Sequence, residues 1–111
     1  MAFQQILALN GQLPLSASFN SPVIGPVDFI STGTAWTAVG AGPIGMEILI
    51  DGQVISKSVM YANLQSDHMT LPTSLGSLTL SSVGPHTVEI VAANGNTTTD
   101  VNDFFSVTIQ Y

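Results

Sequence analysis

Apolar and polar residues alternate along most of this chain, and this period of two restricts the fold more than any other feature. Between residues 44 and 50, isoleucine or methionine occupies every second position. Because the side chains of a β-strand point alternately to its two faces, this pattern predicts a strand with one buried face. The Asp51-Gly52 pair that follows predicts a two-residue type I′ turn, and a return strand is expected from about Gln53 to Tyr61.

The same alternation recurs in short segments throughout the chain, and no segment shows the helical period of about 3.6 residues. Further strands are expected over residues 6–9, 15–19, 27–31, 34–37, 68–71, 75–80, 86–92 and 104–111. About eight to ten short strands at this spacing are typical of an antiparallel β-sandwich or barrel. We therefore expect an all-β fold that forms a single domain over residues 1–111. The last strand is expected at the centre of its sheet, because the chain ends inside it without a polar tail.

Charged residues are scarce, and this scarcity excludes several classes of partner. The chain has seven acidic residues and one lysine, for a net charge of −6, and only 7% of its residues are charged. Nucleic acid is excluded because binding to backbone phosphates needs several cations. Insertion into a membrane is not expected either, since no apolar run reaches about 18 residues. The absence of cysteine excludes disulfides and thiolate metal sites.

The first residues bear on localisation. The segment Met1 to Gln5 lacks the basic region of a secretory signal, so no signal peptide is expected. A cytoplasmic location and export by a non-classical route both remain open.

The two histidines each begin a predicted strand. His68 follows Asp67, and a histidine beside a carboxylate can act as a base or ligand, cap a loop or face a neighbouring subunit. His86 alternates with Val88 and Ile90, so we expect it to face inward in a structural role.

The densest group of oxygen-bearing side chains precedes the last strand and comprises Asp100, Asn102 and Asp103. Ca²⁺ prefers ligands of this kind, so these three residues are candidate metal ligands. The spacing is not that of an EF-hand, and the alternative is that they end a loop by bonding nearby backbone amides. We therefore expect either no cofactor or Ca²⁺ at this position.

Four aromatic residues are candidates for sugar stacking or for a subunit interface: Trp36, Tyr61, Phe104 and Tyr111. Trp36 lies among small polar residues, Thr34 and Thr37, which suits a partly exposed platform for a sugar ring. The alternative for such a residue is a place in the core or in a subunit interface. The expected ligand-binding residues are Trp36, Tyr61, Asp67 and His68.

No catalytic motif accompanies these candidates. The sequence lacks the Gly-x-Ser-x-Gly elbow of serine hydrolases and a glycine-rich loop that leads into a helix. The acidic residues are scattered over separate strand ends rather than paired as in glycoside hydrolases. We therefore expect the chain not to be an enzyme.

Several short segments carry a resemblance to a known family: Ile44–Met46, Leu49–Gly52, Ser66–His68, Gly84–Val88 and Thr99–Thr108. In these segments the chain resembles small bacterial proteins of the C1q/TNF-like jelly-roll kind, and the likeness covers about two thirds of the chain. The resemblance implies an antiparallel β-sandwich of jelly-roll type and a compact homotrimer with the last strand near the three-fold axis. Such modules bind glycans or proteins at loops or subunit seams and share no catalytic residue.

A second likeness is to the two-calcium, fucose-binding bacterial lectins, which carry an Asp-x-Asn-Asp run before their final strand. On this resemblance Asp100, Asn102 and Asp103 are calcium ligands. The chain departs from that family at Asn96 and Thr97–Thr99, where the lectins have acidic residues, and at Tyr111, where they end in glycine.

Together these features predict a non-catalytic, lectin-like carbohydrate-binding module presented on a homotrimer. The alternative is a structural, self-assembling subunit of a filament, coat or decoration layer. Both predictions include self-association, because a monomer this small and this rich in apolar residues would expose much of them.

Overall fold

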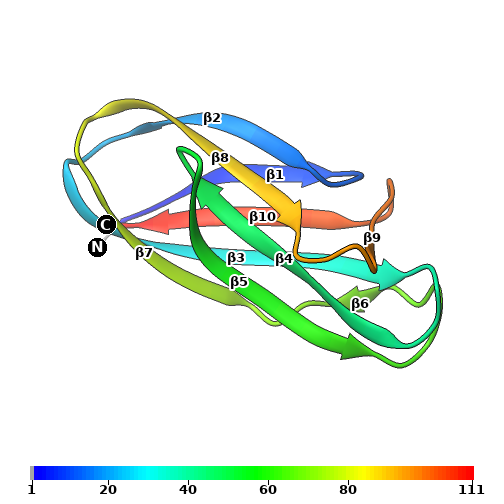
Figure 1. Cartoon of the computed structure of the whole chain (residues 1–111). Coiled ribbons are helices and arrows are strands. Elements are labelled where there is room, and N and C mark those ends of the chain that lie inside the picture. The colour runs from blue at the N-terminus through cyan, green and yellow to red at the C-terminus, as the bar shows by residue number, and fades with distance from the viewer. Residues whose placement is uncertain (1) are drawn as a thin grey trace.

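The computed structural model describes residues 2–111, and these residues form strands joined by turns and loops (Figure 1). The strands are β1 (Phe3–Asn10), β2 (Leu15–Ser21), β3 (Gly25–Thr37), β4 (Gly42–Ile50), β5 (Gln53–Ala62), β6 (Met69–Thr70), β7 (Ser74–Leu80), β8 (Gly84–Ala92), β9 (Thr97–Thr98) and β10 (Phe104–Gln110). Across residues 2–111 there is no helix of the length and apolar character that would span a membrane.

The strands form two antiparallel sheets with the order of a jelly roll. The first sheet runs β1-β10-β3, and β7, β6 and β9 also pair with β3. The second sheet runs β2-β8-β4-β5. With β7 as the fourth main strand of the first sheet, consecutive main strands alternate between the sheets except at the β4–β5 hairpin, which is the connectivity of a jelly roll. The predicted all-β jelly-roll sandwich is therefore confirmed, as is the central position of the last strand, β10, between β1 and β3.

One hydrophobic core fills the space between the two sheets. Its largest fully buried side chains include Phe29 and Phe105 from the first sheet and Met46 and Ile90 from the second. Burial of each such side chain stabilises the fold by about 1.5–3 kcal/mol. The alternating residues predicted to face inward from β4, Ile44 to Ile50, are all 0% exposed.

The β4–β5 hairpin turns as its sequence predicts. Asp51 and Gly52 have φ values of 50° and 83°, which are the two positive angles of a type I′ turn. The pairing of the two strands shifts between Ile48 and Leu49, so a bulge lies close to the turn.

The main difference from the predicted strands concerns residues 27–37. Two strands, 27–31 and 34–37, were expected, but β3 is one continuous strand of 13 residues. Gly33 is not a break: a Cβ added there would lie 2.5 Å from Cδ1 of Phe105 and 2.9 Å from Sδ of Met46. The glycine is therefore required by close packing between the sheets, and the uninterrupted strand extends as far as Trp36 and Thr37.

His86 has the structural, inward-facing role that its sequence position predicts. His86 is 7% exposed, its ring stacks on Phe19 with centroids 5.6 Å apart, and both ring nitrogens face acceptors. Nδ1 lies 2.5 Å from Oδ2 of Asp51 and Nε2 lies 2.8 Å from the Ser82 carbonyl oxygen. Only the imidazolium donates from both nitrogens, so the Asp51 hydrogen bond, followed by the Ser82 bond, raises the pKa of His86.

Asp51 fastens the tip of the β4–β5 hairpin to β8. Its Oδ1 accepts a hydrogen bond from the Thr87 amide at 2.9 Å, while its Oδ2 accepts from His86. Desolvation raises the pKa of Asp51, but the bonds from His86 and Thr87 and the histidine charge outweigh it, and the net pKa lies below the ordinary value.

The His86–Asp51 pair is expected to stabilise the fold by an amount that depends on pH. A His86→Gln variant measures this contribution. A raised folded-state pKa gives His86 a stabilising contribution that is complete below its ordinary pKa of 6.5 and is lost as the pH rises through the folded value. The Asp51 contribution is complete above its ordinary pKa of 3.8 and is lost as the pH falls through its lowered value. Between pH 3.8 and pH 6.5, urea unfolding is expected to give the variant a free energy of unfolding about 1.5–3 kcal/mol below that of the wild type.

The difference between wild type and variant is expected to shrink above neutral pH and again in strong acid. Since His68 titrates in both proteins, its contribution cancels in this comparison. A difference that stays constant from acid to alkaline pH contradicts the assignment.

Candidate functional site

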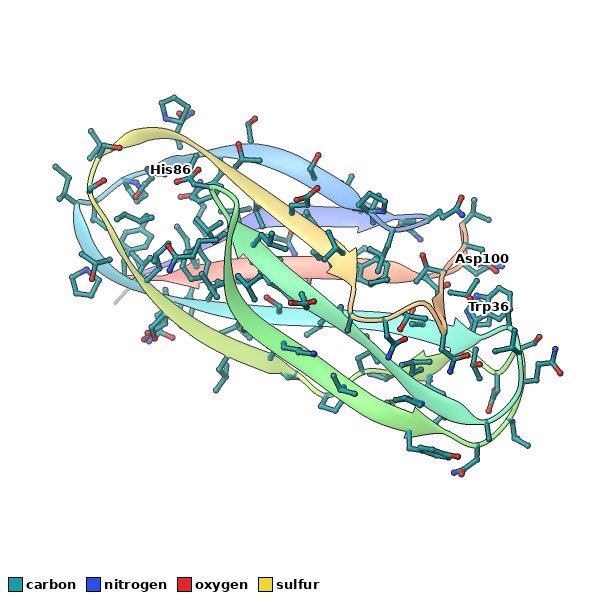
Figure 2. All side chains as sticks on the ribbon, in the orientation of Figure 1. Trp36, His86 and Asp100 are labelled. Atoms are coloured by element: carbon teal, nitrogen blue, oxygen red, sulfur yellow. The ribbon has the colours of Figure 1, made fainter. Side chains whose placement is uncertain are left out.

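Most of the predicted site residues, but not Tyr61, come together at the end of the sandwich where β3 finishes. Figure 2 shows Trp36 and Asp100 at this end and His86 at the other. Two short strands flank β3 here: β6 pairs with Thr34 and Ala35, and β9 pairs with Trp36 and Thr37. Ala35 is opposite Met69, so continuing this antiparallel register by one residue places His68 opposite Trp36. We call Trp36, His68, Asp100 and Asp103 the His68 cluster.

Asp103 is the buried anchor of the His68 cluster. It is 0% exposed, and its Oδ1 accepts hydrogen bonds from the Thr34 hydroxyl at 2.7 Å and from Nδ1 of His68 at 2.8 Å. Its Oδ2 accepts from the backbone amide of Asp100 at 2.8 Å. All these partners can donate, so both carboxylate oxygens of this buried residue are hydrogen-bonded.

The His68 ring is oriented by this anchor. Because Nδ1 donates to Asp103, the neutral ring carries its lone pair on Nε2, which lies 3.7 Å from Oδ2 of Asp100. That separation is too long for a hydrogen bond. The His68 side chain is 37% exposed, so a ligand can reach the imidazole from solvent.

Acidic neighbours surround the imidazole. The hydrogen bond to Asp103 is the largest cause and raises the pKa of His68. Desolvation, the next largest, lowers it, and the charges of Asp103, Asp100 and Asp67 raise it, so that the net pKa lies above the ordinary value. Asp67 itself is exposed and lies in the loop before β6.

Trp36 forms the aromatic side of the cluster. Its indole and the His68 imidazole have centroids 5.7 Å apart and planes inclined by 37°. Trp36 points outward from β3, since its neighbours Ala35 and Thr37 are 0% exposed, yet it remains partly buried. Its Nε1–H is buried and has no hydrogen-bond partner among residues 2–111.

The loop from Asp100 to Asp103, where the sequence left open a calcium site or a loop closed by Asx residues, contains hydrogen bonds to its own backbone. Oδ1 of Asp100 accepts from the Asn102 amide at 2.8 Å, and the Asp103 amide donates to the Asp100 carbonyl at 3.0 Å. These bonds close the loop in the manner of Asx residues. The groups that are close enough to share a metal ion are His68, Asp100 and Asp103, whose ligand atoms lie within 4.8 Å of one another. Asn102 is exposed.

Tyr61 is the predicted ligand residue that the structure places apart. It lies on β5 of the second sheet, paired with Pro43, and is 60% exposed. Because Ala62 beside it is buried, Tyr61 points outward from the second sheet, whereas Trp36 points outward from the first. The two aromatic side chains are therefore on opposite faces of the sandwich, and Tyr61 is not part of the His68 cluster.

Sequence reasoning named Thr34 as a neighbour of Trp36 but did not identify it as a partner of Asp103. Its hydroxyl donates to Asp103 and accepts from the Phe104 amide at 3.3 Å, so it links β3 to the start of β10. The signal that points to it is the alternation itself, which puts Thr34 on the same face of the strand as Trp36, two residues further on.

A groove of about 640 Å³ lies away from the His68 cluster, beside β3 and β7. Its apolar lining includes Ile30, Ile55 and Leu75. Asp28, the carboxylate in the lining, accepts a hydrogen bond from the Ser77 hydroxyl at 2.6 Å. The lining also includes the aromatic Phe29, but it contains no imidazole, so the groove lacks the indole, imidazole and carboxylate combination of the His68 cluster.

Comparisons with known proteins support the fold. No protein-family model matches the chain, and no curated protein matches its sequence. Among solved structures, the chain is similar to the C-terminal domain of EclA, described as a sugar-binding protein, with a TM-score of 0.50 and 14% identity over 99% of this chain and 79% of that one. It also resembles the CBM36-1 domain of a multidomain xylanase from the hindgut metagenome of Trinervitermes trinervoides, with a TM-score of 0.47 and 18% identity over 94% and 76% of the two chains. At such identities, the likeness to the EclA domain shows a shared β-sandwich fold.

Proposed function

We propose that this chain is a non-catalytic carbohydrate-binding module and that the His68 cluster is its ligand seat. The observation that carries the proposal is the pairing of a partly buried indole with a fixed imidazole and an exposed carboxylate on one open end of the sandwich. The EclA domain, which has the same fold, is described as sugar-binding, and this supports the proposal.

The chemistry of the cluster suits a sugar. A pyranose ring offers an apolar C–H face, which packs against an aromatic ring, and a rim of hydroxyls, which need acceptors and donors. Trp36 supplies the aromatic surface, and the Asp100 carboxylate, 39% exposed, supplies acceptors. Nε2 of His68 accepts when neutral and donates when protonated.

A non-catalytic role is proposed because the imidazole has no nucleophile to activate. In a Ser-His-Asp triad, the nitrogen opposite the carboxylate faces a hydroxyl. In the described part of the chain, the recorded polar partners of the His68 ring are Asp103 at Nδ1 and Asp100 at Nε2.

Screening on a glycan array tests this function. The wild-type chain is expected to bind a defined set of glycans, and Trp36→Ala to bind the same glycans at least about tenfold more weakly, since aromatic anchors dominate binding energies. Asp100→Asn, a change at an exposed side chain, is expected to weaken binding as well. Phe3→Ala removes an exposed aromatic residue from the other end of the first sheet and is the matched control.

Two results would contradict the proposal. One is the absence of any glycan bound by the folded wild-type chain, with and without divalent cations. The other is binding that Tyr61→Ala removes and Trp36→Ala leaves unchanged, which would move the seat to the second sheet.

We also propose that the chain self-associates, as a trimer on the C1q/TNF-like resemblance. The supporting observation is β5, an edge strand of the second sheet on which Val54, Val59 and Tyr61 are 50%, 44% and 60% exposed. An unpaired edge with apolar side chains is a surface that another copy can cover. Lys57, on the same strand, is its only cation.

Light scattering on the purified chain measures this association directly. The expected mass is three times the 11.6 kDa of one chain. Ordered polymers seen by electron microscopy, together with no glycan binding, would favour the alternative of a structural subunit. A stable monomer over a wide concentration range would contradict both forms of self-association.

A further inference from the structure

We propose that the His68 cluster binds a divalent transition-metal cation, of which Zn²⁺ is the probe, through Nε2 of His68 and the carboxylate of Asp100. The proposed ion shares its surface with the proposed sugar seat, but its binding does not depend on that function. Three features of the cluster support it: the orientation of the imidazole, the spacing of the two ligand atoms and the chemistry of the donor set.

The orientation of His68 is that of a metal-binding histidine. Such residues commonly donate their second ring N–H to a carboxylate, which fixes the tautomer and strengthens the ligand nitrogen. Asp103 takes this part: it is fully buried, and it accepts from Nδ1 at 2.8 Å while Thr34 and the Asp100 amide hold its position. Nε2 is thereby presented, unprotonated in the neutral ring, on the open side.

The spacing of Nε2 and Oδ2 of Asp100, 3.7 Å, fits two ligands of one ion. With bonds of about 2.0–2.1 Å, two ligands of a tetrahedral Zn²⁺ lie about 3.3–3.4 Å apart. A small rotation of the Asp100 side chain covers the difference. Oδ1 of Asp100 is held by the Asn102 amide, which leaves Oδ2 without a recorded hydrogen bond in the described chain.

The donor set distinguishes this ion from Ca²⁺. Calcium takes six to eight oxygen ligands, whereas an imidazole nitrogen suits zinc, copper, nickel and their neighbours. Asp103, one of the oxygens that a calcium site over Asp100, Asn102 and Asp103 would need, is already bonded to Thr34, His68 and a backbone amide. Asp103 is therefore a positioning residue in this proposal and not a ligand.

Protein ligands at two positions leave the rest of the coordination shell for water or for hydroxyls of a bound molecule. The open, partly exposed side of the cluster has room for them, since the side chains of His68 and Asp100 are 37% and 39% exposed.

Isothermal titration of the full-length chain, free of any polyhistidine tag, tests the proposal with ZnCl₂ and CaCl₂ at one neutral pH. The wild type is expected to bind one Zn²⁺ per chain and to show no comparable heat with Ca²⁺. His68→Gln and Asp100→Asn are expected to lose at least about tenfold in affinity, because each removes a ligand. Asp103→Asn is expected to lose about 10–100-fold, as variants of orienting carboxylates do.

Asp28→Asn is the matched control, because it removes one negative charge from the groove away from the His68 cluster, and its affinity is expected to stay within about threefold of the wild type. His68 and Asp100 are exposed, so circular dichroism of their variants is expected to match the wild type even if Asp103→Asn fails to fold.

No heat with millimolar Zn²⁺ would overturn the proposal, and so would Zn²⁺ binding that His68→Gln leaves unchanged. Tight Ca²⁺ binding that is lost in Asn102→Ala would favour the loop site instead. Since the titration contains no sugar, Zn²⁺ binding without any glycan binding would support this site while contradicting the proposed function. Glycan binding that chelation leaves unchanged, in a chain that gives no heat with Zn²⁺, would support the proposed function and contradict the proposed metal site.

Discussion

The functional end of this molecule depends on the hydrogen bonds that the buried Asp103 carboxylate accepts. A carboxylate without partners in such a place would cost several kcal/mol, whereas each bond to a charged acceptor contributes about 1.5–3 kcal/mol. The donors come from three parts of the chain: Thr34 on β3, His68 before β6 and the Asp100 amide in the last loop. Asp103 thus fixes the loop, the imidazole and the end of β3 relative to one another.

The continuous strand β3 gives that anchor a rigid base. Its inward residues belong to the core, and its outward residues carry Thr34 and Trp36 to the His68 cluster. Gly33 allows β3 to continue without a break, because the Phe105 ring packs directly against the backbone there. Stability and site geometry are therefore linked: the same strand that closes the core presents the indole and the hydroxyl on its other face.

The fold was accessible from the sequence because its determinants are local. Alternation predicted the strands, and Asp51-Gly52 predicted its turn, since both signals lie within a few residues. The break expected near Gly33 was wrong, because the need for a glycine there comes from Phe105, far along the chain. Trp36, His68 and Asp100 were identified as candidates by residue type. Their mutual geometry and the part played by Thr34 were not, because the Thr34–Asp103 contact spans 69 residues. Tyr61 was grouped with them on aromatic character alone, which does not specify the sheet or the face.

Several of the few acidic residues of the chain lie around its two histidines. Asp51 meets His86 at one end of the sandwich, and Asp67, Asp100 and Asp103 surround His68 at the other. In each case a carboxylate orients a histidine, but with opposite results. His86 is buried with both nitrogens hydrogen-bonded, whereas the His68 side chain is 37% exposed and its Nε2 lies 3.7 Å from Asp100, too far for a hydrogen bond. This difference separates a structural histidine from a candidate binding residue.

The most direct test of the central claim is the tautomer of His68, read from the ¹⁵N chemical shifts of its ring by long-range ¹H–¹⁵N correlation NMR. Well above its raised pKa, the neutral ring is expected to carry its hydrogen on Nδ1, facing Asp103, with Nε2 unprotonated. Asp103→Asn, if folded, is expected to lose this preference. A neutral ring with its hydrogen on Nε2, or the tautomer mixture of free histidine, would contradict the claim that Asp103 presents Nε2 to a ligand.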